Sequence, residues 1–151
     1  MLQQRILIRT FIEQVEQAAP DGGGFADTIA ALAAAVWRTV CEKPETYQLL
    51  NELNLFALRT PSLGAVLAGQ YRDLIEVVTE LVTRTAERTG QGLAQSAETI
   101  ARFFLAGFDG LSLQRLAFPD DESEVTCLRA LVSATVALAD GRLKLVTVSV
   151  D

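Results

Sequence analysis

Residues 101–119, ARFFLAGFDGLSLQRLAFP, are the stretch that decides the fold. Their apolar side chains fall on nearly every side of a helix, which is expected to end just before Pro119. A helix that is apolar all round must be buried on two faces. In a small protein the second face usually belongs to another chain. The stretch therefore predicts a long helix that needs a partner as well as a core.

Composition limits the class of protein. The chain has 151 residues, half of them apolar and 21% charged, which suits a single folded domain and excludes disorder. The formal net charge is −6, and an acidic chain without a basic cluster is poorly matched to phosphate backbones. No residue is therefore expected to bind DNA. No window offers 18 uninterrupted apolar residues, so no membrane span is expected.

The residues needed for metal or catalytic chemistry are scarce. The chain has no histidine, the commonest general base and zinc ligand. Cys41 and Cys127 lack metal-ligand spacing and are expected to be reduced core thiols of a cytosolic protein. The acidic run from Asp120 to Glu124 lies between two helices, where capping explains it better than a metal site. No catalytic residue, metal ligand or cofactor is therefore predicted. The start of the chain is amphipathic rather than continuously apolar, so no signal peptide is predicted.

Helical periodicity and breakers predict an all-α fold of six helices without a hairpin. Thr60 is expected to cap the fourth helix, with Pro61 as its first residue. Asp121 is expected to cap the last helix, with Glu124 completing a capping box. The expected helices span residues 2–18, 25–41, 45–59, 61–88, 96–118 and 121–140.

Two stretches together resemble a known family. Residues 50–72, LNELNLFALRTPSLGAVLAGQYR, place an Arg-x-Pro step before a helix that carries Tyr71 and Arg72. Residues 101–119 follow with Asp-Gly-Leu, Gln114 and Pro119, and then comes the last helix. In this order, over about residues 46–140, the set resembles the C-terminal regulatory domain of TetR-family transcriptional repressors.

The resemblance implies an architecture. Its last two helices would pair with their two-fold mates as a four-helix bundle, and the preceding helices would enclose a pocket for a small, often apolar inducer. Residues 1–20 would match a connecting helix and 21–141 the regulatory domain. The tail, 142–151, alternates weakly and is either a short strand or disordered. The family's helix-turn-helix half has no counterpart in these residues, so DNA would be reached only through a domain that they do not contain.

The predicted dimer surface lies on the last two helices. Ala130, Ser133, Ala134 and Ala137 are small and share one side of the last helix, which permits close helix approach. Gly107 and Gly110 each cost the preceding helix ~1 kcal/mol relative to alanine, which a close crossing would explain. Alternatively, both helices form the core of a monomeric bundle. The predicted interface residues are Gly107, Leu111, Leu128, Leu131, Val132, Thr135 and Leu138.

The predicted ligand pocket combines aromatic residues with one amide. Asn54 shares a helix face with Tyr47, Leu50 and Ala57, and a buried amide needs hydrogen-bond partners. The alternative for each candidate is ordinary core packing. The predicted ligand-binding residues are Trp37, Tyr47, Asn54, Tyr71, Phe104 and Phe108.

The functional hypothesis is an effector-binding and homodimerisation domain of a cytoplasmic, non-enzymatic repressor. A small, apolar effector would shift the population of helix arrangements and so bias a linked DNA-binding module. Two alternatives remain open: a helical dimer for interaction or structure without a pocket, and a small helical enzyme marked by a polar cleft of carboxylates.

Overall fold

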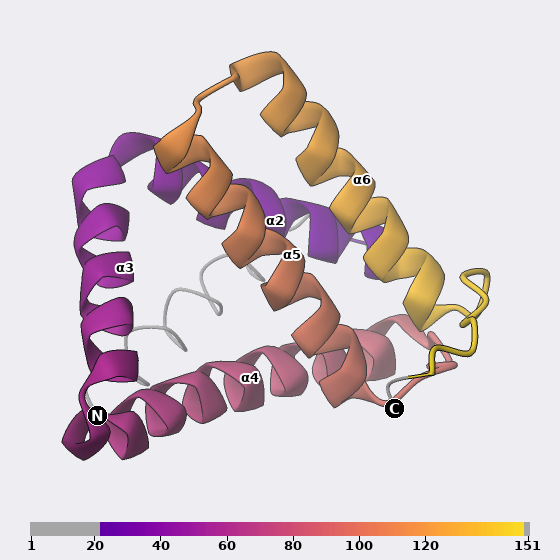
Figure 1. Cartoon of the computed structure of the whole chain (residues 1–151). Helices are drawn as coiled ribbons and strands as arrows, with labels where there is room; N and C mark the ends of the chain where they lie inside the picture. Colours follow the sequence, from indigo (N-terminus) through magenta and orange to yellow (C-terminus); the bar gives the residue numbers. More distant parts are fainter. Residues whose placement is uncertain (1–21, 150–151) are drawn as a thin grey trace.

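A computed structural model describes residues 22–149 of the chain, and all regular structure within that range is helical (Figure 1). The helix expected over residues 2–18 lies outside the described residues. The other five predicted helices are confirmed, with bounds within two residues of those expected. They are α2 (Phe25–Glu42), α3 (Pro44–Arg59), α4 (Pro61–Thr89), α5 (Ala97–Ala117) and α6 (Asp121–Ala139).

Local hydrogen bonds explain where the last two helices begin. Ser96 caps α5 by accepting a hydrogen bond from the Thr99 backbone N–H at 3.1 Å. Asp120, not Asp121, caps α6: its carboxylate accepts the Ser123 backbone N–H at 3.2 Å. The capping prediction was thus wrong by one residue, because Asp120 holds the extended backbone that a cap requires.

The start of α4 is confirmed in position but not in its capping bond. Pro61 is the first residue of the helix, as predicted. Thr60 makes no side-chain cap, because its hydroxyl donates instead to the Phe56 carbonyl of α3 at 2.9 Å. At the other end, Gly90 adopts φ +67°, a left-handed conformation that favours glycine and ends the helix.

The helices form an open, angular arrangement. α3, α4 and α5 mark the sides of a triangle, α2 passes behind α5, and α6 runs beside α5 (Figure 1). Residues of α2 take part in every cluster of the core among the described residues, which makes α2 the central element of the core.

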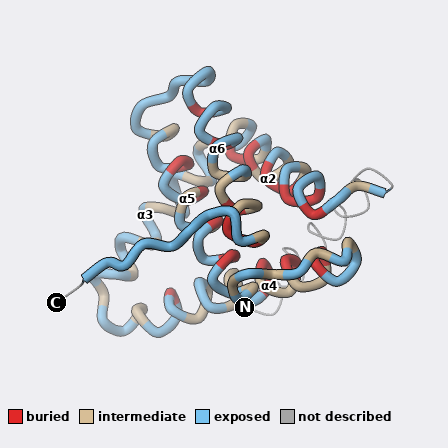
Figure 2. Tube along the Cα trace, turned by 90° about the vertical axis from the view of Figure 1, so that its right-hand side faces the viewer, coloured by how far each residue is buried: buried red, intermediate tan, exposed pale blue. Residues whose placement is uncertain are grey.

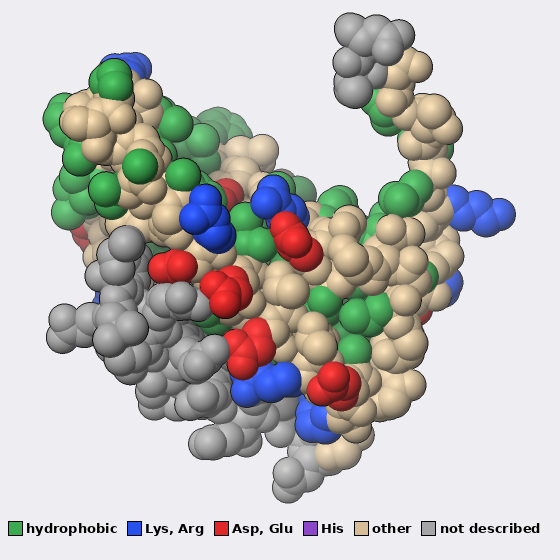
Figure 3. Space-filling view, turned by 90° about the horizontal axis from the view of Figure 1, so that it is seen from below, with side chains coloured by type: hydrophobic (Ala, Val, Ile, Leu, Met, Phe, Trp, Pro, Cys, Tyr) green, Lys and Arg blue, Asp and Glu red, His purple; other side chains and the backbone are tan. Residues whose placement is uncertain are grey.

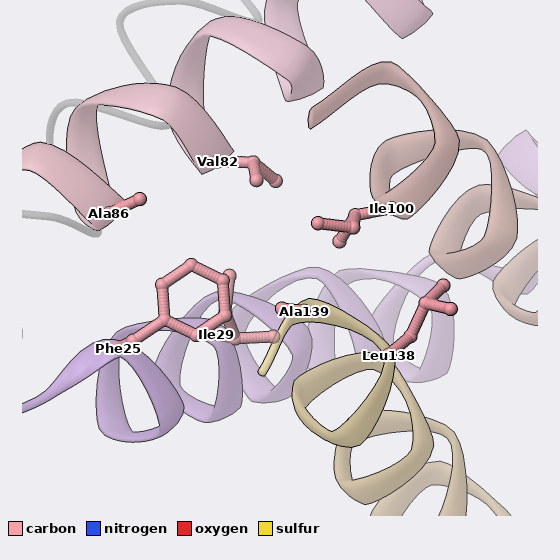
Figure 4. Packing of buried hydrophobic residues seen from close by; sticks show 7 residues of the cluster. All are labelled: Phe25, Ile29, Val82, Ala86, Ile100, Leu138 and Ala139. Atoms are coloured by element: carbon pink, nitrogen blue, oxygen red, sulfur yellow. The ribbon is translucent and has the colours of Figure 1, made fainter. Parts of the chain in front are cut away.

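The core follows α2 (Figure 2). Near its start, residues of α2, α4, α5 and α6 meet in one cluster (Figure 4). Leu32 packs farther along against Val77 and Leu81 of α4. The cluster in Figure 4 comprises Phe25, Ile29, Val82, Ala86, Ile100, Leu138 and Ala139.

α3 differs from the other helices because none of its residues is buried. Tyr47, Asn54 and Ala57 of the predicted inward stripe are only half-buried, and Leu50 is exposed. The expectation of a buried stripe on this helix was therefore wrong. Apolar side chains gather at the corner where α3 meets α4, while charged side chains line the rest of that face along α4 (Figure 3).

Two further expectations were corrected. Cys127 is exposed rather than in the core, while Cys41 is half-buried, and both are free thiols. The described part of the tail, residues 142–149, is exposed and forms no strand. Among the described helices, none is both long enough and apolar enough to cross a membrane.

Candidate functional site

Three of the predicted pocket residues meet in the core as an aromatic cluster, Trp37, Phe104 and Phe108. The Trp37 and Phe108 rings lie edge to face with centroids 5.8 Å apart, and Phe104 lies at the same distance from Phe108. All three are buried, and Tyr47 of α3 packs against the same group. The cluster joins α2, α5 and α3 within the core.

Two other candidates converge on an acidic residue that sequence reasoning did not select. Asp109 of α5 lies near enough to Tyr47 of α3 and Tyr71 of α4 for its charge to act on both phenols. Desolvation by burial, and then the negative charge of Asp109, raise the pKa of both phenols. Asp109 is itself exposed, and partial desolvation by the neighbouring helices raises the pKa of its carboxyl. Asn54 lies half-buried on the face of α3 that carries Tyr47.

Tyr71 also lines a groove of about 700 Å³ between α4 and α5, which we call the α4–α5 groove. Tyr71 and Thr79 line it from α4, and the paired Glu98 and Arg102 line it from α5. The Thr79 hydroxyl is buried and makes no hydrogen bond within the described residues. A buried hydroxyl beside the groove is suited to a ligand that offers a hydrogen-bonding group.

Arg115 organises the opposite end of α5. Its guanidinium pairs with the exposed Asp121 at 2.8 Å and with the buried Glu124, and it lies 6.0 Å from the centroid of the Trp37 ring. Hydrogen bonds to the two carboxylates raise the pKa of Arg115 well above its usual range. Glu124 also accepts the Asp120 backbone N–H at 2.9 Å, so one ion cluster fixes the turn from α5 to α6 against α2.

Arg115 also lines a second groove, of about 820 Å³, between α2 and α6; we call it the α2–α6 groove. Trp37 and Cys41 line it from α2, and Leu128 and Val132 from α6. Burial raises the pKa of the Cys41 thiol, which disfavours the nucleophilic thiolate.

The predicted dimer residues take two kinds of position. Leu111, Leu128, Thr135 and Leu138 are buried in the chain's own core, and Leu131 and Val132 are half-buried. A Cβ at Gly107 would clash with a methyl carbon of the Leu131 side chain, so this glycine permits a close crossing of α5 and α6 within one chain.

Outside this crossing, α5 and α6 share a surface that we call the outer face. Its α5 residues recur at spacings of three and four, and no charged residue interrupts it. Phe103 and Leu113 are exposed there by 38% and 53%, and a Cβ at Gly110 would meet no neighbour. The outer face comprises Phe103, Ala106, Gly110, Leu113 and Ala117 of α5 and Cys127, Ala130, Ser133, Ala134 and Ala137 of α6.

Sequence reasoning missed the polar groups that shape these surfaces. Asp109 was visible as an acidic residue in an apolar helix, but its facing partners come from α3 and α4. Arg115 was visible too, yet its partners depend on how the α5–α6 turn folds. Within the described residues, no group of three or more His, Cys, Asp and Glu side chains could hold a metal ion.

Residues 23–138 match the family model described as the tetracyclin repressor-like, C-terminal domain. Comparison with curated proteins and with solved structures gives no match. The matched segment contains all five described helices apart from the last residue of α6. The chain therefore belongs to the TetR-like C-terminal domain family, as its sequence predicted.

Proposed function

We propose that this member of the TetR-like C-terminal domain family is the effector-binding and homodimerisation domain of a cytoplasmic repressor, without enzymatic activity. It would occupy residues 21–141, with residues 1–20 as the connecting helix. DNA would be bound by a helix-turn-helix domain that these residues do not include. The observation that carries the proposal is the uncharged outer face of α5 and α6, within a chain of the family that pairs through its last helices.

The outer face has the character of a helix-pairing surface. Exposed Phe103 and Leu113 supply apolar area, whose removal from water favours association. Small residues such as Gly110 and Ala130 permit the helices of a second copy to approach closely. In this dimer, Leu111, Leu128, Thr135 and Leu138 support the interface from the core beneath. The contacts themselves come from the outer face.

The effector would bind at the α4–α5 groove and the polar groups beside it. Tyr71 and Thr79 offer hydroxyls, and the aromatic cluster supports the neighbouring helices. An effector that holds α4 against α5 would favour one arrangement of these helices over another. Because α5 also carries the outer face, such a shift would reach the dimer geometry.

The dimer is tested by placing a charge on the outer face. Leu113→Glu and, separately, Ala130→Glu are expected to convert a dimer into a monomer in native mass spectrometry, because each buries a carboxylate at the contact. Leu58→Glu is the matched control: Leu58 is 71% exposed on α3, away from the outer face. A monomeric wild-type chain at micromolar concentration would refute the dimer.

The effector site is tested with the chain purified gently from its expression host. Native mass spectrometry is expected to show a dimer that carries added mass from a small molecule. Tyr71→Ala is expected to remove that mass, while Arg59→Gln, a control outside the groove, retains it. A dimer that never carries added mass and gives no change in Trp37 fluorescence across a broad ligand screen would instead favour an interaction protein without a pocket.

A further inference from the structure

The α2–α6 groove shares no lining residue with the α4–α5 groove. It is hollow because α2 presents alanines there, Ala30, Ala33 and Ala34, where larger side chains would fill the space. Its volume of about 820 Å³ lies within the range of about 300–1,000 Å³ that is typical of ligand pockets.

The floor of this groove is apolar and continuous with the core. Trp37 and Leu128 belong to the buried cluster that also contains Phe108, and half-buried Val132 packs against it. Binding is favourable when a ligand's hydrocarbon displaces water from an apolar floor of this kind.

The walls of the groove carry more arginines than carboxylates. Arg38 projects from α2 and Arg129 from α6; both are exposed, and neither forms an ion pair within residues 22–149. The groove's carboxylates, Asp121 and Glu124, are both engaged by Arg115. Three arginines against two carboxylates leave one net positive charge, in a chain whose formal net charge is −6.

We propose that the α2–α6 groove is a second ligand site, which takes an amphipathic molecule with an apolar body and one carboxylate headgroup. The hydrocarbon lies along Trp37, Leu128 and Val132. The carboxylate is bound by Arg38 and Arg129, because a guanidinium forms short, charge-assisted hydrogen bonds with carboxylates. The assignment is independent of the effector site proposed above.

Dodecanoate is the probe, added below the concentration at which it aggregates. Calorimetry and the emission of Trp37, the chain's single tryptophan, are expected to report saturable binding of one molecule per chain. Dodecylammonium, which has the same chain and the opposite charge, is expected to bind at least about tenfold more weakly. Equal binding of dodecanoate, dodecylammonium and dodecan-1-ol would overturn the role of the arginines.

Two pairs of variants locate the site. The double variant Arg38→Gln, Arg129→Gln is expected to weaken dodecanoate binding by about tenfold or more, and Arg59→Gln on α3 is its control. Ala34→Leu is expected to abolish binding by filling the groove. Ala34 is exposed, so the larger side chain does not overpack the core. Ala26→Leu, at an exposed α2 position outside the groove, is expected to bind normally.

The outcomes are separable from those of the proposed function. Unchanged dodecanoate binding in Ala34→Leu would overturn the site, and so would a loss of self-association in that variant without a change in dodecanoate binding. The second result would assign the groove to another copy of the chain. Unchanged dodecanoate binding with intact self-association would leave the Leu113→Glu and Tyr71→Ala tests unaffected. A loss of self-association would instead move the dimer contact toward the groove, and the Leu113→Glu result would show whether the outer face takes part as well.

Discussion

α2 and α3 follow one another in the chain and have similar lengths, 18 and 16 residues, yet the protein uses them differently. Seven residues of α2 are buried, whereas none of α3 is buried and six of its large apolar side chains are exposed. Both sequences are rich in apolar residues, so apolar content alone did not distinguish the buried helix from the exposed one. Burial followed from position: α2 lies at the centre, while α3 forms one side of the triangle.

The strongest test of this contrast removes the largest side chain of α2. Trp37→Ala is expected to lower the free energy of unfolding by about 3–5 kcal/mol, because it empties a buried site against Phe108. Urea unfolding followed by circular dichroism would measure the change, since the variant has no tryptophan. A loss below about 1 kcal/mol would mean that α2 is not the centre of the core.

A smaller effect is expected where the ion cluster holds α2. Glu124→Gln keeps the shape of the side chain but leaves Arg115 with Asp121 as its remaining anion. We expect a loss of about 1–3 kcal/mol in urea unfolding, because a partly buried guanidinium loses one of its two counter-charges. Glu122→Gln, an exposed neighbour on the same turn, is the control and should change stability by less than about 0.5 kcal/mol.

The packing of α3 against α5 can be tested through the charge of Asp109. The raised pKa of Asp109 means that the folded state disfavours its charge, so this contribution to stability falls as pH rises above the ordinary aspartate range. Asp109→Asn is therefore expected to stabilise the fold at neutral pH, by less than about 1 kcal/mol because solvent screens a partly exposed group. At a pH low enough to protonate the carboxyl, variant and wild type should be equally stable.

The same variant should change a spectroscopic titration. Tyr47 and Tyr71 are the only tyrosines of the chain, so the ultraviolet phenolate signal reports these two groups alone. Asp109→Asn is expected to lower both phenolic pKa values, since the neighbouring negative charge helps to raise them. Asp27→Asn, at the start of α2, should leave the titration unchanged. An unshifted titration in Asp109→Asn would mean that Asp109 of α5 does not lie near the phenols of α3 and α4.

The smallest effect is expected on the outer side of α3. Leu53 is 55% exposed, so Leu53→Ala should change the free energy of unfolding by no more than about 0.5 kcal/mol. Urea unfolding of a dilute sample would measure it. A loss of 2 kcal/mol or more would show that this surface is covered in solution, and the contrast with α2 would fail.

The sequence predicted well what depends on neighbours along the chain, and less well what depends on other helices. Breakers and periodicity placed five helices within two residues of their observed bounds. The cap of α6 was misplaced by one residue because two adjacent aspartates offer the same chemistry, and only the backbone of Asp120 is extended.

The candidate site divides in the same way. Trp37, Phe104 and Phe108 were expected together and are in contact, because their spacing places them on the inward sides of α2 and α5. The large apolar residues chosen for the dimer, such as Leu128, instead face the chain's own core. Periodicity identifies an apolar stripe but not which neighbour it meets. Asp109 and Arg115 acquire their partners only when helices distant in sequence come together.

The two cysteines differ in a way that can report whether two copies of the chain are paired. Cys127 is exposed on the outer face, whereas burial lowers the reactivity of Cys41 by raising the pKa of its thiol. A thiol-directed spin label or fluorophore would therefore attach at one position of the unmodified chain. In the proposed dimer, Cys127 lies within the contact between the two copies, so pairing would slow its labelling. The rate of labelling would then follow the opening of the paired helices directly, without an added reporter residue.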